Sequence, residues 1–355
     1  RAESGERSTA VGHLATATGI RSVAIGENAD AQGDNATAIG NESIANGADA
    51  LAIGDTAMAT GPSTTAVGGE SVATGPGAST FGWRAESGER STAVGHLATA
   101  TGVRSVAIGE NADAQGDNAT AIGNESIANG ADALAIGDTT MATGTSTTAV
   151  GGESIANGTA ATAFGWKSNA TGERAHAMGH LATATGDRTL AVGEAATATG
   201  EQASAIGNEA SATGIDAMAI GTQSVANGNS TTAVGGESVA TGPGATAFGW
   251  QSGANSERAT ALGHLAQADG IRSTAVGEAA TAQGLESVAI GNQSSATGTD
   301  AMAIGTMAVA NGNSTTTVGG ESVATGAGAT AYGWQSAANA ERSTALGHLA
   351  QANGV

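Results

Sequence analysis

The chain has 355 residues, of which 57 are glycine and none is cysteine, and only 2% are aromatic although 40% count as hydrophobic. Alanine therefore supplies most of the apolar residues, which excludes a thick globular core and stabilisation by disulfides. The formal net charge of −20, from 12 Lys and Arg against 32 Asp and Glu, favours solubility and makes nucleic acid and anionic lipid unfavourable partners.

The stretch at residues 22–33 is the unit that the rest of the chain repeats, and it predicts two short strands. Residues 22–26 and residues 29–33 each alternate with period two, so that successive side chains point to opposite faces. One face of each strand carries only Ser, Ala or Gly. We expect these two small faces to stack on each other and to form a thin, flat coil.

The outward faces of the two strands differ. In the second strand they carry Asp30 and Gln32, which suit contact with water. In the first strand they carry Val23 and Ile25, and no part of the same coil can cover them. The pattern therefore predicts that another molecule covers the first strand.

Glycine marks the period of the unit. It recurs at every seventh position over residues 5–82 and again over residues 88–354, except at Ser256 and Ala340. The step from 82 to 88 is one residue short, which we interpret as a local deletion. Two sevens make a turn of fourteen residues, so the chain holds about 25 turns of an all-β, parallel β-solenoid.

A longer repeat lies on the short one. Its copies end in Phe-Gly-Trp or Tyr-Gly-Trp and span residues 1–83, 84–166, 167–250 and 251–334, with a partial copy at 335–355. We predict one continuous domain over residues 1–355. The chain begins and ends inside a repeat, and we expect it to be a piece of a longer protein whose capping and anchoring parts lie elsewhere.

A large apolar residue occupies the fourth position of every first strand, and this regularity argues against disorder. The large apolar residues of the first strands are predicted to form a subunit interface, and we call them the apolar stripe. They are Val11, Val23, Ile25, Ile39, Leu51, Ile53, Val67, Phe81, Val106, Ile108, Ile122, Ile136, Val192, Ile206, Ile220, Val276, Ile290 and Ile304. A continuous exposed stripe marks an interface, and identical chains with identical stripes predict a closed symmetric bundle. Three narrow ribbons around an axis fit better than two, so we predict a homotrimeric rod.

Candidate chemistry is scarce, and we predict no catalytic residues, no cofactor and no metal ligands. Gly-His-Leu-Ala recurs once per long repeat, which places five histidines about six turns apart: His13, His96, His180, His264 and His348. We interpret them as turn residues, with metal binding as the alternative. The four Trp residues follow a strand-ending Gly, and packing at the rim or ligand stacking are the two roles considered. Arginines just before the first strand, several of them after an acid, favour exposed ion pairs over an acidic-ligand site.

The run Ser-Val-Ala-Ile-Gly-x-x-Ser/Ala with its fourteen-residue period resembles the YadA-like head repeat of trimeric autotransporter adhesins over essentially the whole chain. The resemblance implies a left-handed parallel β-roll with three chains around one axis. It also implies a location on the surface of a Gram-negative bacterium, anchored in the outer membrane through a C-terminal segment that is absent here.

In that family the motif Asn-Ser-Val-Ala-Ile-Gly-x-x-Ser is associated with collagen binding. The nearest matches are residues 286–294, which lack the leading Asn, and residues 35–43, which have Ala-Thr in place of Ser-Val. The resemblance thus makes these residues candidates for ligand binding: Ser287, Val288, Ala289, Ile290, Gly291 and Ser294.

The sequence therefore predicts a non-enzymatic adhesin head that binds a host extracellular matrix protein or cell-surface receptor at many weak sites. An ice-binding solenoid is one alternative, suggested by Thr-x-Thr pairs such as Thr16 and Thr18, but neighbouring turns break the threonine ladder. A purely structural spacer is another. A β-helix acyltransferase would need a six-residue period and a catalytic His in a loop insertion, which this sequence lacks.

Overall fold

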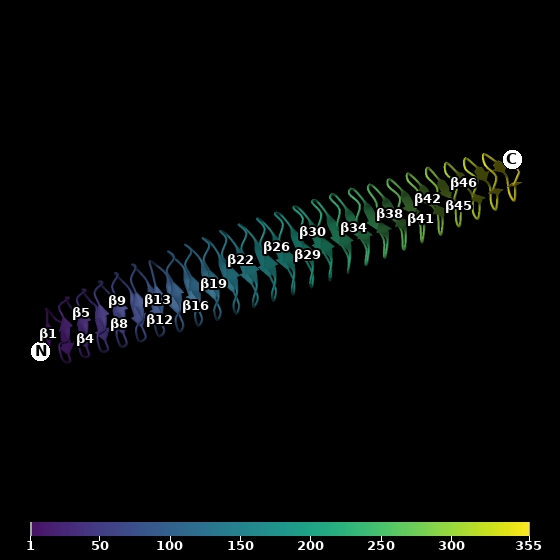
Figure 1. Ribbon diagram of the computed structural model, residues 1–355. Coiled ribbons are helices and arrows are strands. Elements are labelled where there is room, and N and C mark those ends of the chain that lie inside the picture. The colour runs from purple at the N-terminus through teal and green to yellow at the C-terminus, as the bar shows by residue number, and fades with distance from the viewer. Residues whose placement is uncertain (1, 355) are drawn as a thin grey trace. The chain divides into compact units, whose positions relative to one another are not determined.

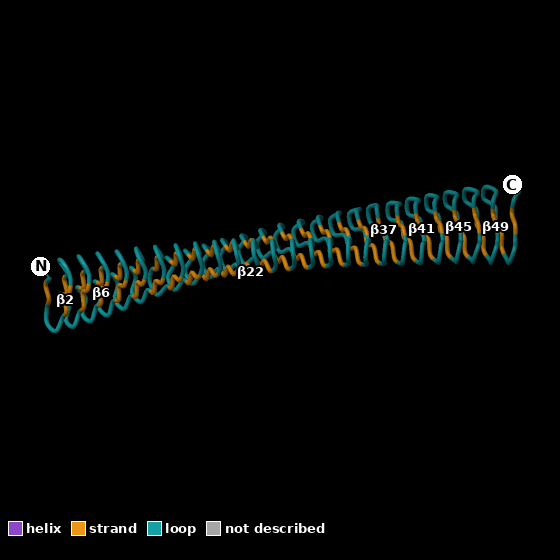
Figure 2. The backbone as a smooth tube through the Cα atoms, turned by 90° about the horizontal axis from the view of Figure 1, so that it is seen from below, coloured by secondary structure: helices purple, strands orange, loops and turns teal. Residues whose placement is uncertain are grey.

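The computed structural model describes residues 2–354, which form 51 short β-strands and no helix. It divides into two compact units, residues 1–175 and 176–355, and each is described by itself. In both, strands stack turn upon turn, with loops on either side of the stack (Figure 1, Figure 2). Across residues 2–354 no helix is long and apolar enough to cross a membrane.

Each turn contains one three-residue strand, which carries an even number, and one two-residue strand, which carries an odd number. The first even strands are β2 (Thr9–Val11), β4 (Val23–Ile25), β6 (Thr37–Ile39), β8 (Leu51–Ile53), β10 (Thr65–Val67) and β12 (Ser79–Phe81). The first odd strands are β1 (Glu3–Ser4), β3 (Thr16–Ala17), β5 (Asp30–Ala31), β7 (Ile44–Ala45), β9 (Met58–Ala59) and β11 (Val72–Ala73). The same pair recurs in every later turn, up to β50 (Thr344–Leu346) and β51 (Gln351–Ala352).

All strand pairing is parallel within each unit, between equivalent strands of successive turns. Ile25 of β4 pairs with Ile39 of β6, and Asp30 of β5 pairs with Ile44 of β7. Each unit is therefore two parallel sheets back to back, one of even and one of odd strands. The predicted all-β parallel solenoid of fourteen-residue turns is confirmed, and the left hand of the coil stays a prediction.

The one-residue deletion between residues 82 and 88 falls after an odd strand. Glu86 of β13 (Glu86–Ser87) still pairs with Thr99 of β15 (Thr99–Ala100), only thirteen residues further on. The neighbouring even strand β14 (Thr92–Val94) pairs with β12 residue for residue. The loop absorbs the missing residue, and the register of both sheets is kept.

The interior of the coil contains only small side chains. Ala24 and Ala31, from the two strands of one turn, are fully buried, and the largest fully buried side chains are threonines. In the turn that holds β12 and β13, Thr80 and Ser87 replace two alanines and hydrogen-bond to each other inside the coil. The predicted stacking of the two small faces is confirmed, and the space between the sheets explains why large residues are kept outside.

The glycines of the seven-residue period fall into two classes. Those after an even strand, such as Gly26, have φ near +138°, and a Cβ there would lie 2.2 Å from the carbonyl oxygen of Gly40. Those after an odd strand, such as Gly33, have no positive φ, but a Cβ would still meet the backbone of the next turn. Ser256 and Ala340 belong to the second class, which explains why a side chain is tolerated there.

Each turn between strands has a residue in the left-handed region two positions after its glycine. After Gly33 this residue is Asn35, with φ of 59°, and the Ala36 N–H donates to the Gly33 carbonyl at 3.1 Å. In many turns where the next residue is Ser or Thr, its hydroxyl donates to the same carbonyl, as Ser22 does to Gly19 at 2.8 Å. The hydroxyls of Ser154, Ser273 and Ser287 are exceptions, since they have no hydrogen-bond partner among the described residues. The left-handed positions point their side chains away from the coil, and their identity therefore varies freely.

Candidate interface and surface sites

The apolar stripe lies on the outward face of the sheet of even strands. Its members occupy the first or third residue of their strands, and none is fully buried. Register joins them into ladders within each unit, as where Ile39 pairs with Ile25 on one side and Ile53 on the other. The structure thus brings these residues together on one face of each unit, where nothing in the described chain covers them.

The two faces of the solenoid expose their apolar side chains unequally. On the even strands Val11 is 55% exposed and Phe164 is 50% exposed. The large apolar side chains of the odd strands, such as Ile127 and Met141, are all half-buried. The even-strand face is therefore the one with the greater need of a covering partner.

The six ligand-binding candidates do not form one accessible surface. Ser287, Ala289 and Ser294 are fully buried inside the coil, and the Ser294 hydroxyl donates to the Gly291 carbonyl at 3.0 Å. In β42 (Val288–Ile290) only Val288 and Ile290 point outward. Contact between this motif and a ligand stays a prediction, and it would fall to these two apolar residues.

The Trp residues and the His residues of the Gly-His-Leu-Ala motif lie in turns that follow even strands and form part of one column along each unit. The Trp83 indole stacks on the His96 imidazole at 4.9 Å with an angle of 8° between the rings. On the preceding turn Gly69 makes room, since a Cβ there would lie 3.2 Å from the indole Cδ1. His96 Nδ1 in turn lies 3.4 Å from a Glu110 carboxylate oxygen. The indole lies between two turns, an arrangement that favours packing at the rim over ligand stacking.

We expect Trp83→Ala to lower the free energy of unfolding by about 0.5–1.5 kcal/mol, the usual contribution of a stacked aromatic pair. The Trp83→Phe variant, which keeps an aromatic ring beside His96, should lose less. Urea denaturation of the purified variants measures both values. Equal stability of Trp83→Ala and the parent chain would contradict the packing role.

Several arginines just before the even strands form exposed ion pairs with glutamates. Arg174 Nε lies 3.6 Å from Glu173 Oε1, and Arg342 Nε lies 3.8 Å from Glu341 Oε1, with all four side chains more than half exposed. Such pairs contribute at most about 1 kcal/mol each. Over residues 2–354 no group of three or more His, Cys, Asp or Glu side chains is placed to hold a metal ion.

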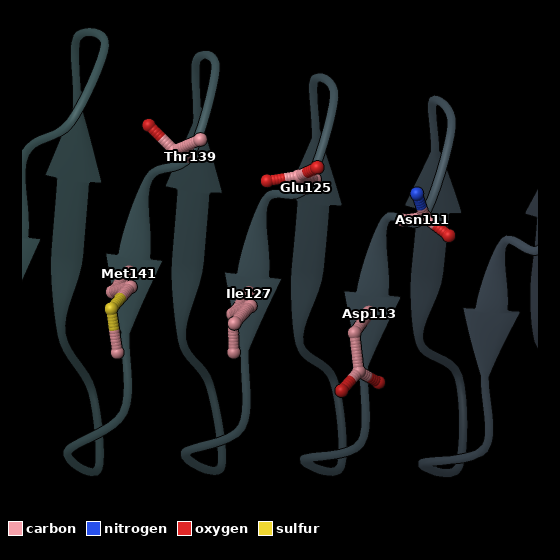
Figure 3. A pocket seen from close by; sticks show the side chains of 6 residues that line it. All are labelled: Asn111, Asp113, Glu125, Ile127, Thr139 and Met141. Carbon is pink, nitrogen blue, oxygen red and sulfur yellow. The ribbon is translucent and has the colours of Figure 1, made fainter.

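A groove of about 440 Å³ lies on the odd-strand sheet of the first unit and was not anticipated from the sequence. Asp113, Ile127 and Met141 form one row, each the first residue of its strand: β17 (Asp113–Ala114), β19 (Ile127–Ala128) and β21 (Met141–Ala142). A second row on the adjoining turns consists of Asn111, Glu125 and Thr139 (Figure 3). The signal was present in the fourteen-residue spacing of Ile44, Met58 and Val72 in the first copy, which places three apolar residues on the second face.

Asp113 is the titratable group most affected by this groove. Burial raises the pKa of its carboxyl group, and a hydrogen bond from Gln115 Nε2 to Oδ2 at 2.8 Å lowers it by less. Its Oδ1 is shielded from solvent and accepts no hydrogen bond from the described residues. The ionised carboxylate is therefore incompletely compensated.

We expect Asp113→Asn to stabilise the chain at pH 7 and to leave its stability at pH 3 unchanged. A carboxyl whose pKa is raised on folding contributes stability at low pH, and that contribution is lost as the pH rises through the folded-state pKa. The amide removes the cost of burying a charge, so the difference between the two proteins should grow with pH. Urea denaturation midpoints at both pH values measure it, and a variant that is less stable at pH 7 would contradict the assignment.

The fold and its surfaces together define a class of protein: a parallel β-solenoid with a small-residue interior and one outward face of exposed aliphatic side chains. A family model described as the YadA head domain repeat (2 copies) matches nearly the whole chain, and the chain belongs to this family. The matched residues are 4–29, 31–57, 59–85, 87–112, 114–140, 142–168, 170–193, 184–210, 212–238, 240–266, 268–294, 296–322, 316–336 and 338–355.

Among solved structures, the chain is similar to the crystal structure of the collagen-binding domain of the Yersinia adhesin YadA. The two are 26% identical over an alignment that covers 48% of this chain and 69% of the other, with a TM-score of 0.24. No curated protein matches the chain. The family is that of a YadA-like adhesin head, and the parallel β-solenoid agrees with it.

Proposed function

We propose that residues 1–355 act as one continuous head in a homotrimer whose protomers meet along their apolar stripes. One observation carries this proposal: the even-strand face exposes large apolar side chains along each unit, whereas the odd-strand face does not. Burying a Val or Ile side chain contributes about 1.5–3 kcal/mol, so a stripe of this length strongly favours association. Identical chains close such contacts by rotational symmetry.

The trimer adheres to a host extracellular matrix protein or cell-surface receptor by multivalent, non-enzymatic binding. Family membership supports this role, as does the repetition of the same turn surface along each unit. It also supports a location on the bacterial cell surface, with anchorage in the outer membrane by a segment outside residues 1–355. Many weak contacts on three chains produce avidity without a deep pocket.

Two measurements test the proposal. Light scattering coupled to gel filtration should give a mass three times that of the 33.6 kDa chain. Solid-phase binding of the trimer to collagen, fibronectin, laminin and a glycan panel should show at least one saturable ligand, with affinity that falls when the subunits are separated. A well-folded monomer at nanomolar concentration would contradict the proposed trimer. A trimer that binds nothing in the panel would contradict the adhesive role and favour a purely structural spacer.

A further inference from the structure

The groove on the odd-strand sheet combines an apolar floor with acidic groups. Ile127 and Met141 are half-buried side chains on successive strands, and Asp113 lies beside them in the same row (Figure 3). Glu125, on the adjoining turn, is exposed at the rim. No Lys, Arg or His is among the six residues that line the groove. The groove therefore has aliphatic surface and uncompensated negative charge side by side.

The same arrangement occurs twice in the first unit. Residues 28–58 repeat residues 111–141 with a single difference, Ala57 against Thr140. Asp30, the counterpart of Asp113, has the same bond from a glutamine amide, here Gln32, and an Oδ1 that is likewise buried and unpaired within the described chain. Six turns separate the two aspartates, which corresponds to about 29 Å at the usual strand spacing.

The second unit keeps the backbone but not the chemistry. In the third copy the positions of Asp30, Ile44 and Met58 are occupied by Thr197, Ser211 and Val225. These replacements lie in equivalent strands, β29 (Thr197–Ala198), β31 (Ser211–Ala212) and β33 (Val225–Ala226). The solenoid therefore forms without the acid, the isoleucine and the methionine, and the fold does not require these residues.

We propose that the groove around Asp113 in the first unit, and the equivalent surface around Asp30, each bind a lysine- or arginine-bearing segment of a partner polypeptide that has aliphatic neighbours. A long basic side chain lays its methylene stem along Ile127 and Met141 and brings its cationic head to the Asp113 carboxylate, while the exposed Glu125 at the rim adds negative charge that attracts a second cation of the segment. A second copy of this chain is a less suitable occupant of the groove, because the exposed aliphatic side chains lie on the other sheet. The proposal rests on the proposed assembly only in that this sheet stays outside the trimer.

The probe is a fluorescein-labelled hexapeptide of alternating Lys and Leu, titrated with the complete 355-residue chain and followed by fluorescence anisotropy. Alternating Lys and Ser tests the apolar floor, and alternating Glu and Leu tests the charge. We expect the Lys-Leu peptide to bind most tightly and the Glu-Leu peptide not to bind. Equal binding of all three peptides, or of none, overturns the proposal.

The deciding variant introduces the chain's own third-copy residues, so that folding is preserved: D30T, I44S and M58V together with D113T, I127S and M141V. It should bind the Lys-Leu peptide at least about tenfold more weakly, since it loses a charge-assisted hydrogen bond as well as the apolar floor. A second variant, D30N, E42Q, D113N and E125Q, removes four charges from the grooves. Its matched control, E6Q, E27Q, E89Q and E110Q, removes four charges elsewhere in the same unit and should bind within twofold of the parent chain.

Three results overturn the proposal: a control that weakens binding as much as the groove variant, a third-copy variant that binds normally, and a groove variant that no longer forms the parent's oligomer. The last result would assign the groove to a neighbouring subunit. Because oligomeric state and matrix binding are measured separately, a failure here is distinguishable from a failure of the proposed function.

Discussion

Simultaneous replacement of Ile25, Ile39 and Ile53 by aspartate is expected to dissociate or unfold the assembly. The three side chains lie directly above one another on β4, β6 and β8. Each buried isoleucine contributes about 1.5–3 kcal/mol, and the variant also places nine carboxylates around the proposed axis of a trimer. Light scattering coupled to gel filtration should show monomer or aggregate in place of trimer.

The control places three aspartates on the opposite face of the same turns, at Gln32, Asn46 and Thr60. These side chains follow the odd strands and lie at the surface, exposed or half-buried. The control changes the net charge by the same amount and should keep the trimer. If the isoleucine variant remains an intact trimer while folding normally, the subunit contact lies on another face.

The glycine classes predict two different costs for the same substitution. Gly54, with φ of +139°, would place an alanine Cβ 2.4 Å from the Gly68 carbonyl oxygen, and we expect Gly54→Ala to lower the free energy of unfolding by about 2–6 kcal/mol. Gly61, in the same turn, has no positive φ, and its Cβ would lie 2.7 Å from the Thr74 carbonyl oxygen. Only overpacking remains there, at about 1–3 kcal/mol.

Urea denaturation followed by far-UV circular dichroism compares the two variants. Gly54→Ala should unfold at clearly lower urea than Gly61→Ala, and both should unfold below the parent. A Gly61→Ala variant that is less stable than Gly54→Ala would contradict the larger cost assigned to glycines that follow even strands.

The sequence predicts the fold well because one short unit contains all of its determinants. Period-two alternation fixes the strands, the seven-residue glycine spacing fixes the turns, and Ser, Ala and Gly fix the inner face. Ala24 and Ala31, on the inner faces of the two sheets, are fully buried for this reason. The hand of the coil is different, since nothing in the alternation distinguishes a left-handed from a right-handed turn.

The surface sites were less accessible to prediction. The apolar stripe was found because every turn repeats it, whereas the groove at Asp113 needs three successive turns that differ from one another. Its two rows come from strand residues and from turn residues two positions earlier, and only the left-handed conformation of Asn111 and Glu125 places the turn residues beside the strand residues. The candidate ligand-binding motif was found from the sequence, but part of it is not on the surface. Ser287 and Ser294 are buried in the interior of the coil, which requires small side chains.

The loop that absorbs a missing residue after β13 has a consequence for how such a gene can change. Because pairing resumes in register after a step of thirteen or fourteen residues, a whole copy can be deleted or inserted in frame and the turns on either side still match. Recombination between the near-identical copies 1–83 and 84–166 would therefore yield shorter or longer proteins in which the strands still pair in register. The number of turns in the head can thus change in evolution without any change in the residues that make its contacts.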